Sequence, residues 1–91
     1  MAYVKPPAGC MRITVLNPLS DPPVTFDVVV GPNGDTISYP PGTVHEAEKE
    51  PGVGWKYPNG TGTTWWFDNG PPQTWAEVGG ANRSGTWGPC P

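Results

Sequence analysis

The sequence VTFDVVV at residues 24–30, followed by GPNG at residues 31–34, decides the fold class. Alternate residues of the first stretch, beginning with Val24 and ending with Val30, are apolar and share one face, which is the period of a β-strand. In the second stretch, proline presets the first central dihedral angle of a turn, and asparagine and glycine tolerate positive φ. We therefore expect a hairpin that leads into a strand at Thr36–Tyr39, with Ile37 and Tyr39 facing inward.

Glycine and proline divide the rest of the chain into short pieces. The 91 residues include 13 glycines and 14 prolines, and the longest stretches free of both, Cys10–Asn17 and Thr43–Glu50, are eight residues long. Helices average about 10–14 residues, and an interior proline costs about 3 kcal/mol. These spacings exclude helix bundles, coiled coils and transmembrane helices. We expect an all-β fold, a small antiparallel β-sandwich or partly open barrel of short strands, with extended termini rich in proline and glycine.

The same patterns predict one domain over residues 1–91. Its parts are an N-terminal arm at 1–10, a β core at 11–78 and a C-terminal arm at 79–91. The strands expected in the core are 11–16, 24–30, 36–39, an edge strand at 43–49, 55–57, 63–67 and 74–78. Neither arm has an obvious partner strand, so we expect at least one of them to contact another chain, with Tyr3 or Trp87 as its anchor.

Residues 11–48 resemble the immunoglobulin-like β-sandwich modules of bacterial and bacteriophage surface proteins. The resemblance lies in a strand followed by Asn17-Pro18, the PVTF alternation at 23–26, the turn at 31–34 and the PPGT corner at 40–43. It covers roughly half of the chain, and the cysteine–tryptophan–cysteine spacing of antibody domains is missing. The resemblance implies a β-sandwich and does not by itself imply a function.

Charge and reactive residues exclude several function classes. The net charge is −3, and the five cationic side chains are scattered, so no basic stripe for nucleic acid is present. The first residues lack the apolar stretch of a secretory signal, which predicts a chain made in the cytosol or a mature fragment. His45 and the two cysteines are too few for a zinc site. Asp68 and Glu77 lie among aromatic residues but in no recognisable hydrolase motif. We expect no enzyme activity, no metal and no cofactor.

Cys10 and Cys90 are separated by 80 positions. A disulfide between them would close nearly the whole chain and stabilise it by about 4 kcal/mol in the chain-entropy model. Such a bridge is typical of extracellular and virion proteins. The alternative is two separate buried thiols.

Aromatic residues dominate the second half of the chain. Trp65 and Trp66 are adjacent, so on a strand their side chains point to opposite faces. One interpretation places Trp65 with Phe67 in the core and Trp66 on a flank. The other is an exposed platform for sugar rings or a protein partner. The candidate contact residues for a partner or a glycan are Tyr3, Trp55, Trp66, Trp75 and Trp87.

Two functions follow from these observations. The first is a non-enzymatic structural subunit of a large assembly, in particular a bacteriophage virion, as a capsid decoration or tail accessory protein. It would be made in the host cytoplasm, and its partners would be other protein subunits or further copies of itself. The second is a secreted or cell-surface carbohydrate-binding module that stacks sugars on exposed tryptophans, with Asn59, Asp68 and Asn69 nearby. Arms that pack on their own domain, closed by a Cys10–Cys90 bridge, would favour the second.

Overall fold

The computed structural model describes residues 3–91, and these residues form an all-β fold, as expected. They contain nine strands and one turn of 3-10 helix, and no α-helix. The strands are β1 (Gly9–Asn17), β2 (Thr25–Val30), β3 (Thr36–Ser38), β4 (Val44–Glu46), β5 (Glu48–Glu50), β6 (Gly54–Pro58), β7 (Thr64–Asp68), β8 (Thr74–Val78) and β9 (Ser84–Pro89). The predicted turn after β2 is confirmed as the 3-10 turn Pro32–Gly34, in which Asn33 has φ 58° and Gly34 has φ 71°.

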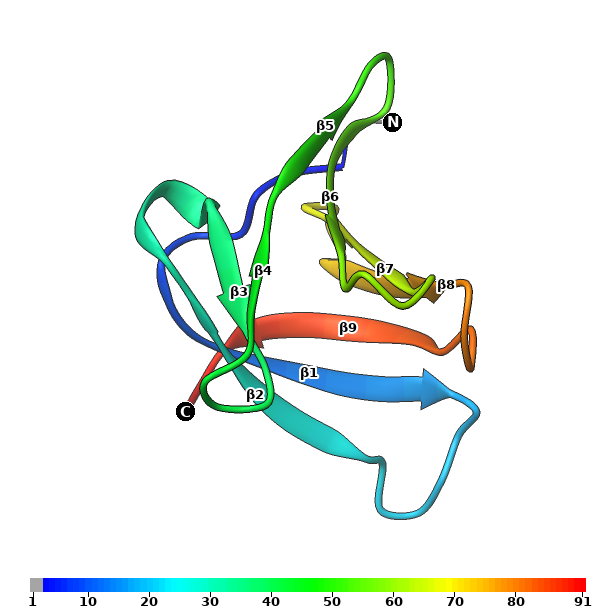
Figure 1. Ribbon diagram of the computed structural model, residues 1–91. Coiled ribbons are helices and arrows are strands. Elements are labelled where there is room, and N and C mark those ends of the chain that lie inside the picture. Colours follow the sequence, from blue (N-terminus) through cyan, green and yellow to red (C-terminus); the bar gives the residue numbers. More distant parts are fainter. Residues whose placement is uncertain (1–2) are drawn as a thin grey trace.

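All nine strands belong to one antiparallel sheet in the order β4-β3-β2-β1-β9-β8-β7-β6-β5. The two strands at the ends of this order are consecutive in the chain and are joined at Ala47. The sheet therefore curls round on itself into a nearly closed barrel (Figure 1), in which β4 and β6 come close together without being neighbours in the hydrogen-bonded order. Of the two expected architectures, the partly open barrel is the one observed. The edge strand expected at 43–49 is split into β4 and β5 at this closure.

The core fills the barrel with the inward-facing residues of every second position. Phe67 and Ile13 are fully buried, and Val28 and Val30 face the core as predicted, while Phe26 is partly buried against it. The buried apolar residues are Met11, Ile13, Val15, Val28, Val30, Ile37, Tyr57, Phe67, Trp75 and Trp87. Because aliphatic residues are few, aromatic side chains supply much of this volume.

The N-terminal segment is part of the barrel. Tyr3 lies between β6 and β7, where its amide donates to the carbonyl of Val53 and its own carbonyl accepts from the amide of Trp55. Val4 donates to the carbonyl of Phe67, and Pro6 is fully buried. The expectation of an arm without a partner strand is therefore wrong for Tyr3 and Val4, because β6 and β7 diverge and leave edges that these two residues pair with. Residues 1 and 2 lie outside the described residues.

The expected C-terminal arm is also corrected. Residues 84–89 form β9, which pairs with β1 on one side and β8 on the other and so lies at the centre of the sheet. Gly85 and Gly88 leave this segment with Trp87 as its one large apolar residue, which obscured its strand pattern. At Gly85 a side chain would collide with the backbone of Thr14, so the small residue permits the close approach of β1.

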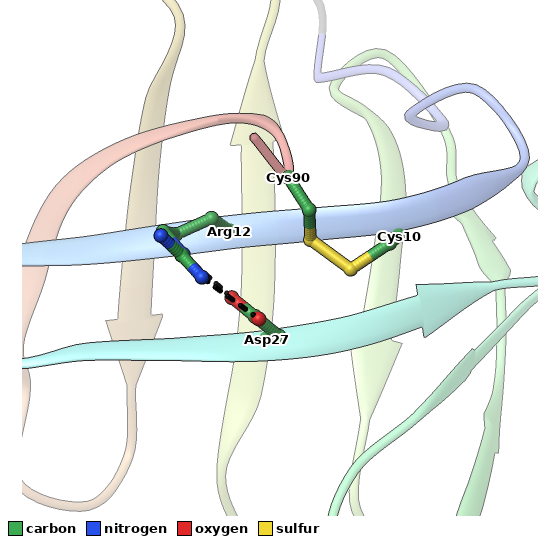
Figure 2. Close-up of a disulfide and its surroundings, with 4 residues drawn as sticks. All are labelled: Cys10, Arg12, Asp27 and Cys90. Carbon is green, nitrogen blue, oxygen red and sulfur yellow. Dashed lines mark hydrogen bonds and ion pairs between the residues drawn. A yellow bond between two sulfur atoms is a disulfide. The ribbon is translucent and has the colours of Figure 1, made fainter.

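Cys10 and Cys90 form a disulfide on the outer surface, beside an ion pair between Arg12 and Asp27 (Figure 2). The Cα atoms of the two cysteines are 5.4 Å apart, and the amide of Cys90 donates to the carbonyl of Cys10 at 3.1 Å. Of the two alternatives for the cysteines, the structure has the bridge. The start of β1 and the end of the chain after β9 are thus held together.

Candidate ligand-binding site at the open end of the barrel

A cavity of about 380 Å³ opens at the end of the barrel opposite the N-terminal segment. We call it the mouth cavity. It is lined by Ile37, Tyr39, Pro40, Thr43, His45, Tyr57, Asn59, Thr61, Thr63, Trp65 and Glu77. Its volume lies within the range of about 300–1,000 Å³ that is usual for small-molecule sites.

The strand pairing explains why these residues meet. Ile37 and His45 are opposite each other on β3 and β4, and Tyr57 and Trp65 are opposite each other on β6 and β7. Glu77 lies opposite Trp65 on β8. All five side chains point inward. They lie on both sides of the gap between the two ends of the sheet, where no hydrogen bonds close the barrel, and the gap leaves space between them.

The loop on one wall is held by Asn59. Its side-chain oxygen accepts hydrogen bonds from the amide of Thr61 at 2.8 Å, from the hydroxyl of Thr61 at 2.8 Å and from the amide of Thr63 at 3.2 Å. Asparagine is favoured in turns because its side chain can bond to the backbone in this way. The threonines that follow are therefore presented to the cavity in a fixed arrangement.

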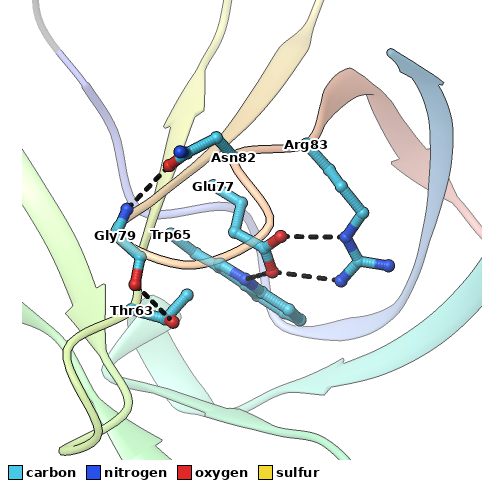
Figure 3. A network of polar contacts seen from close by, with 6 residues as sticks. All are labelled: Thr63, Trp65, Glu77, Gly79, Asn82 and Arg83. Carbon is cyan, nitrogen blue, oxygen red and sulfur yellow. Dashed lines mark hydrogen bonds and ion pairs between the residues drawn. The ribbon is translucent and has the colours of Figure 1, made fainter. Parts of the chain in front are cut away.

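A buried carboxylate fixes the position of Trp65 (Figure 3). Glu77 is 7% exposed, and it accepts two hydrogen bonds from Arg83, at 2.8 and 3.0 Å, and one from the indole nitrogen of Trp65 at 3.0 Å. The hydrogen bonds from Arg83 hold the pKa of Glu77 below its usual value, with a further contribution from the Trp65 donor. The carboxylate is thus charged, paired and hydrogen-bonded at both oxygens, and it orients the indole ring.

Trp65 also belongs to an aromatic cluster at this end of the barrel. Its ring centroid lies 5.6 Å from that of Phe26, 6.0 Å from that of Tyr39 and 5.5 Å from that of Trp75. The guanidinium of Arg83 lies 5.4 Å from the ring centroid of Phe26, within the range of cation–π attraction. Packing on one side and hydrogen bonding at its nitrogen leave Trp65 little freedom to rotate.

Two more lining residues are held by backbone carbonyls. A ring nitrogen of His45, Nε2, lies 3.1 Å from the carbonyl oxygen of Tyr39. At the base of the cavity the Tyr57 hydroxyl donates to the carbonyl of Gly34 at 2.6 Å, and burial raises the pKa of Tyr57. The site is therefore largely preformed.

The structure changes the expected set of contact residues. Trp75 is 1% exposed and Trp87 is 5% exposed, so the expectation that they contact a partner or glycan is wrong, because both rings fill the core. The rings of Tyr3 and Trp66 pack on each other, with centroids 5.0 Å apart. The Lys5 ammonium lies 4.0 Å from the ring centroid of Trp55 and covers part of that ring.

The polar residues proposed beside a glycan are also separated by the fold. Asn59 lines the mouth cavity, whereas Asp68 is at the far end of β7, where it accepts from the amide of Gly70, and Asn69 accepts from Gln73. Asp68 and Glu77 do not form a carboxylate pair, because Glu77 is opposite Trp65 and Asp68 is opposite Thr74. Trp65, Tyr39 and His45 were not among the expected contacts, and alternation along 63–67 was the available signal that Trp65 faces inward.

The described residues contain one group of possible metal ligands, Cys10, Asp27 and Cys90. The disulfide occupies both sulfur atoms, and Asp27 is paired with Arg12. This cluster is therefore a structural feature of the outer surface in the present state of the molecule.

Comparison with known proteins gives no relative. No family model, no curated protein and no solved structure matches this chain. Within residues 3–91, no helix combines the length and the apolar character that a membrane crossing requires. The function must therefore be argued from the mouth cavity and the surface.

Proposed function

We propose that the protein is a carbohydrate-binding module and that the mouth cavity is its binding site. The observation that carries the proposal is a preformed cavity with a fixed tryptophan on one side and unused hydroxyl and amide groups around it. Sugar rings offer apolar C–H faces, which pack on aromatic rings, and hydroxyl groups, which need hydrogen-bond partners. The cavity presents groups of both kinds.

The available polar groups can be named. The side-chain hydroxyls of Tyr39 and Thr43 and the amide nitrogen of Asn59 have no hydrogen-bond partner within residues 3–91. Each lies in the lining of the cavity beside the apolar surfaces of Trp65 and Ile37. A ligand rich in hydroxyl groups would satisfy these three groups and would also cover the apolar surface.

Titration with a glycan panel tests the proposal, with isothermal calorimetry and tryptophan fluorescence as readouts. We expect Trp65→Phe to weaken binding at least tenfold, because it removes the indole area and the hydrogen bond to Glu77. Trp66→Phe, on the opposite face of the same strand, is the matched control and should bind like the wild type. Absence of binding to every glycan, or equal loss in both variants, would contradict the proposal.

A second candidate function is the structural subunit of a virion. The observation that favours it is a pair of exposed valines on the outer face of the sheet: Val29 of β2 and Val44 of β4 are each 58% exposed, and both lie opposite Ser38 of β3. Two exposed valines in register on either side of Ser38 suit a protein interface. The double change Val29→Asp and Val44→Asp should leave the fold intact and abolish incorporation into particles. Normal incorporation would remove this candidate.

A further inference from the structure

The charge of the mouth cavity restricts the kind of carbohydrate that it can hold. Its lining contains neither lysine nor arginine, and its only acidic or basic side chains are His45 and Glu77. Both oxygens of Glu77 are occupied by Arg83 and Trp65, and the His45 ring is bonded to a backbone carbonyl. Arg83 lies behind Glu77, outside the lining, and is already paired with it. A carboxylate or sulfate on a ligand would therefore lose its hydration in the cavity and find no unpaired cation there.

Acidic residues next to the mouth cavity also disfavour anionic ligands. A shallow hollow that shares His45 and Asn59 with the mouth cavity is also lined by Glu46 and Glu48. Both glutamates are exposed and lie on the two strands that meet at the closure of the barrel. Their negative potential repels anions that approach the entrance.

The base of the mouth cavity is closed. Tyr57 forms part of its lining, and the hydroxyl of this tyrosine reaches the carbonyl of Gly34 behind it. A side chain at Gly34 would collide with Lys5 and Pro6, which shows that the N-terminal segment fills the space beyond. A polysaccharide cannot pass through the barrel, and a ring that enters the cavity must do so from one side.

We propose that the mouth cavity binds the terminal residue of an uncharged glycan and excludes both internal residues and anionic sugars. This inference rests on the proposed function, since it names the part and the charge of the carbohydrate that the same site takes. Aromatic stacking on Trp65 and hydrogen bonds to Tyr39, Thr43 and Asn59 supply the attraction. The closed base and the lack of a cation supply the selectivity.

The first test compares neutral oligosaccharides of increasing length, each titrated by calorimetry. Terminal recognition predicts one protein molecule per chain, and affinity per chain that stops rising after the first few sugar units. Binding to internal residues predicts several protein molecules on a long chain and affinity that rises with length. Binding of several protein molecules along one chain would overturn the inference that the site recognises a terminal residue. It would leave the proposed function, carbohydrate binding, in place.

The second test compares each neutral ligand with its uronic acid form. We expect the uronate to bind at least tenfold more weakly, and we expect Thr61→Lys, which places a cation at the cavity and leaves Tyr39, Thr43 and Asn59 unchanged, to recover uronate binding. Leu19→Lys adds the same charge at an exposed residue that lines neither the mouth cavity nor the neighbouring hollow, and it should recover none of the uronate binding. Equal affinity of neutral and anionic forms in the wild type would overturn the charge inference, whereas no binding of any ligand would overturn the proposed function itself.

Discussion

Removal of the Cys10–Cys90 disulfide should destabilise the protein about as much as the largest single truncations in the core. The bridge joins residues 80 positions apart, so in the chain-entropy model it removes about 15 cal/mol/K from the unfolded chain, or about 4.5 kcal/mol at 25 °C. Small domains have a total stability of about 5–15 kcal/mol, so this is a large share of the whole. For a domain of this size each kcal/mol corresponds to about 4–8 °C in Tm, and we expect the Tm to fall by at least about 15 °C.

The assay is thermal unfolding followed by circular dichroism, for the wild type, the wild type in reductant, and the variant Cys10→Ala with Cys90→Ala. The double variant in reductant is the control, because reductant should not change it further. A Tm within about 5 °C of the oxidised wild type would refute the reasoning. It would mean that the ladder between β1 and β9 already holds the two ends together in the unfolded ensemble.

Three further predictions concern the core, the carboxylate and the N-terminal segment. Phe26→Ala should cost about 3 kcal/mol, measured by urea unfolding, because it removes a ring that contacts three other aromatic rings. The pKa of Glu77 is lower in the folded protein than in the unfolded chain, where it is near 4.5, so its stabilising effect is complete above pH 4.5 and is lost as the pH falls through the folded pKa. In a plot of stability against pH, Glu77→Gln should therefore reduce the loss of stability at acidic pH. An unchanged loss would contradict this prediction. Gly54→Ala should release the N-terminal segment at Tyr3, because the new side chain would meet the backbone of Tyr3, and limited proteolysis after Tyr3 would detect it. Gly52→Ala is the control, since Gly52 also has positive φ but faces open space, and equal proteolysis of the two variants would contradict the explanation.

Much of the fold could be predicted from the period of the apolar residues. The alternation at 24–30 placed Val28 and Val30 in the core, and the adjacent pair at 65–66 placed one tryptophan inside and one on a flank. Local patterns of this kind depend only on the two-residue repeat of a strand. Closure of the sheet could not be predicted from this repeat, because it depends on contacts between segments far apart in the chain.

The parts that escaped prediction are those without a local apolar signal. β9 contains Gly85 and Gly88, and its place between β1 and β8 depends on close backbone approach rather than on side-chain burial. The segment at Tyr3 pairs only where β6 and β7 diverge. The mouth cavity could not be predicted for the same reason, since Tyr39, His45 and Trp65 meet only when the two ends of the sheet come together.

The central place of β9 has a consequence for synthesis on the ribosome. Strands β1–β4 form one run of hairpins and β5–β8 form another, and in the hydrogen-bonded order only β9 joins the two runs. The nascent chain must therefore be translated as far as Pro89 before β1 and β8 lose their open edges. Until then both edges are available for pairing with other chains. The contacts between β1 and β9 also form slowly, because the two strands are far apart in the sequence. We therefore expect folding of the barrel to be a late event in translation, because a chain cut short before Ser84 lacks the strand that joins the two runs.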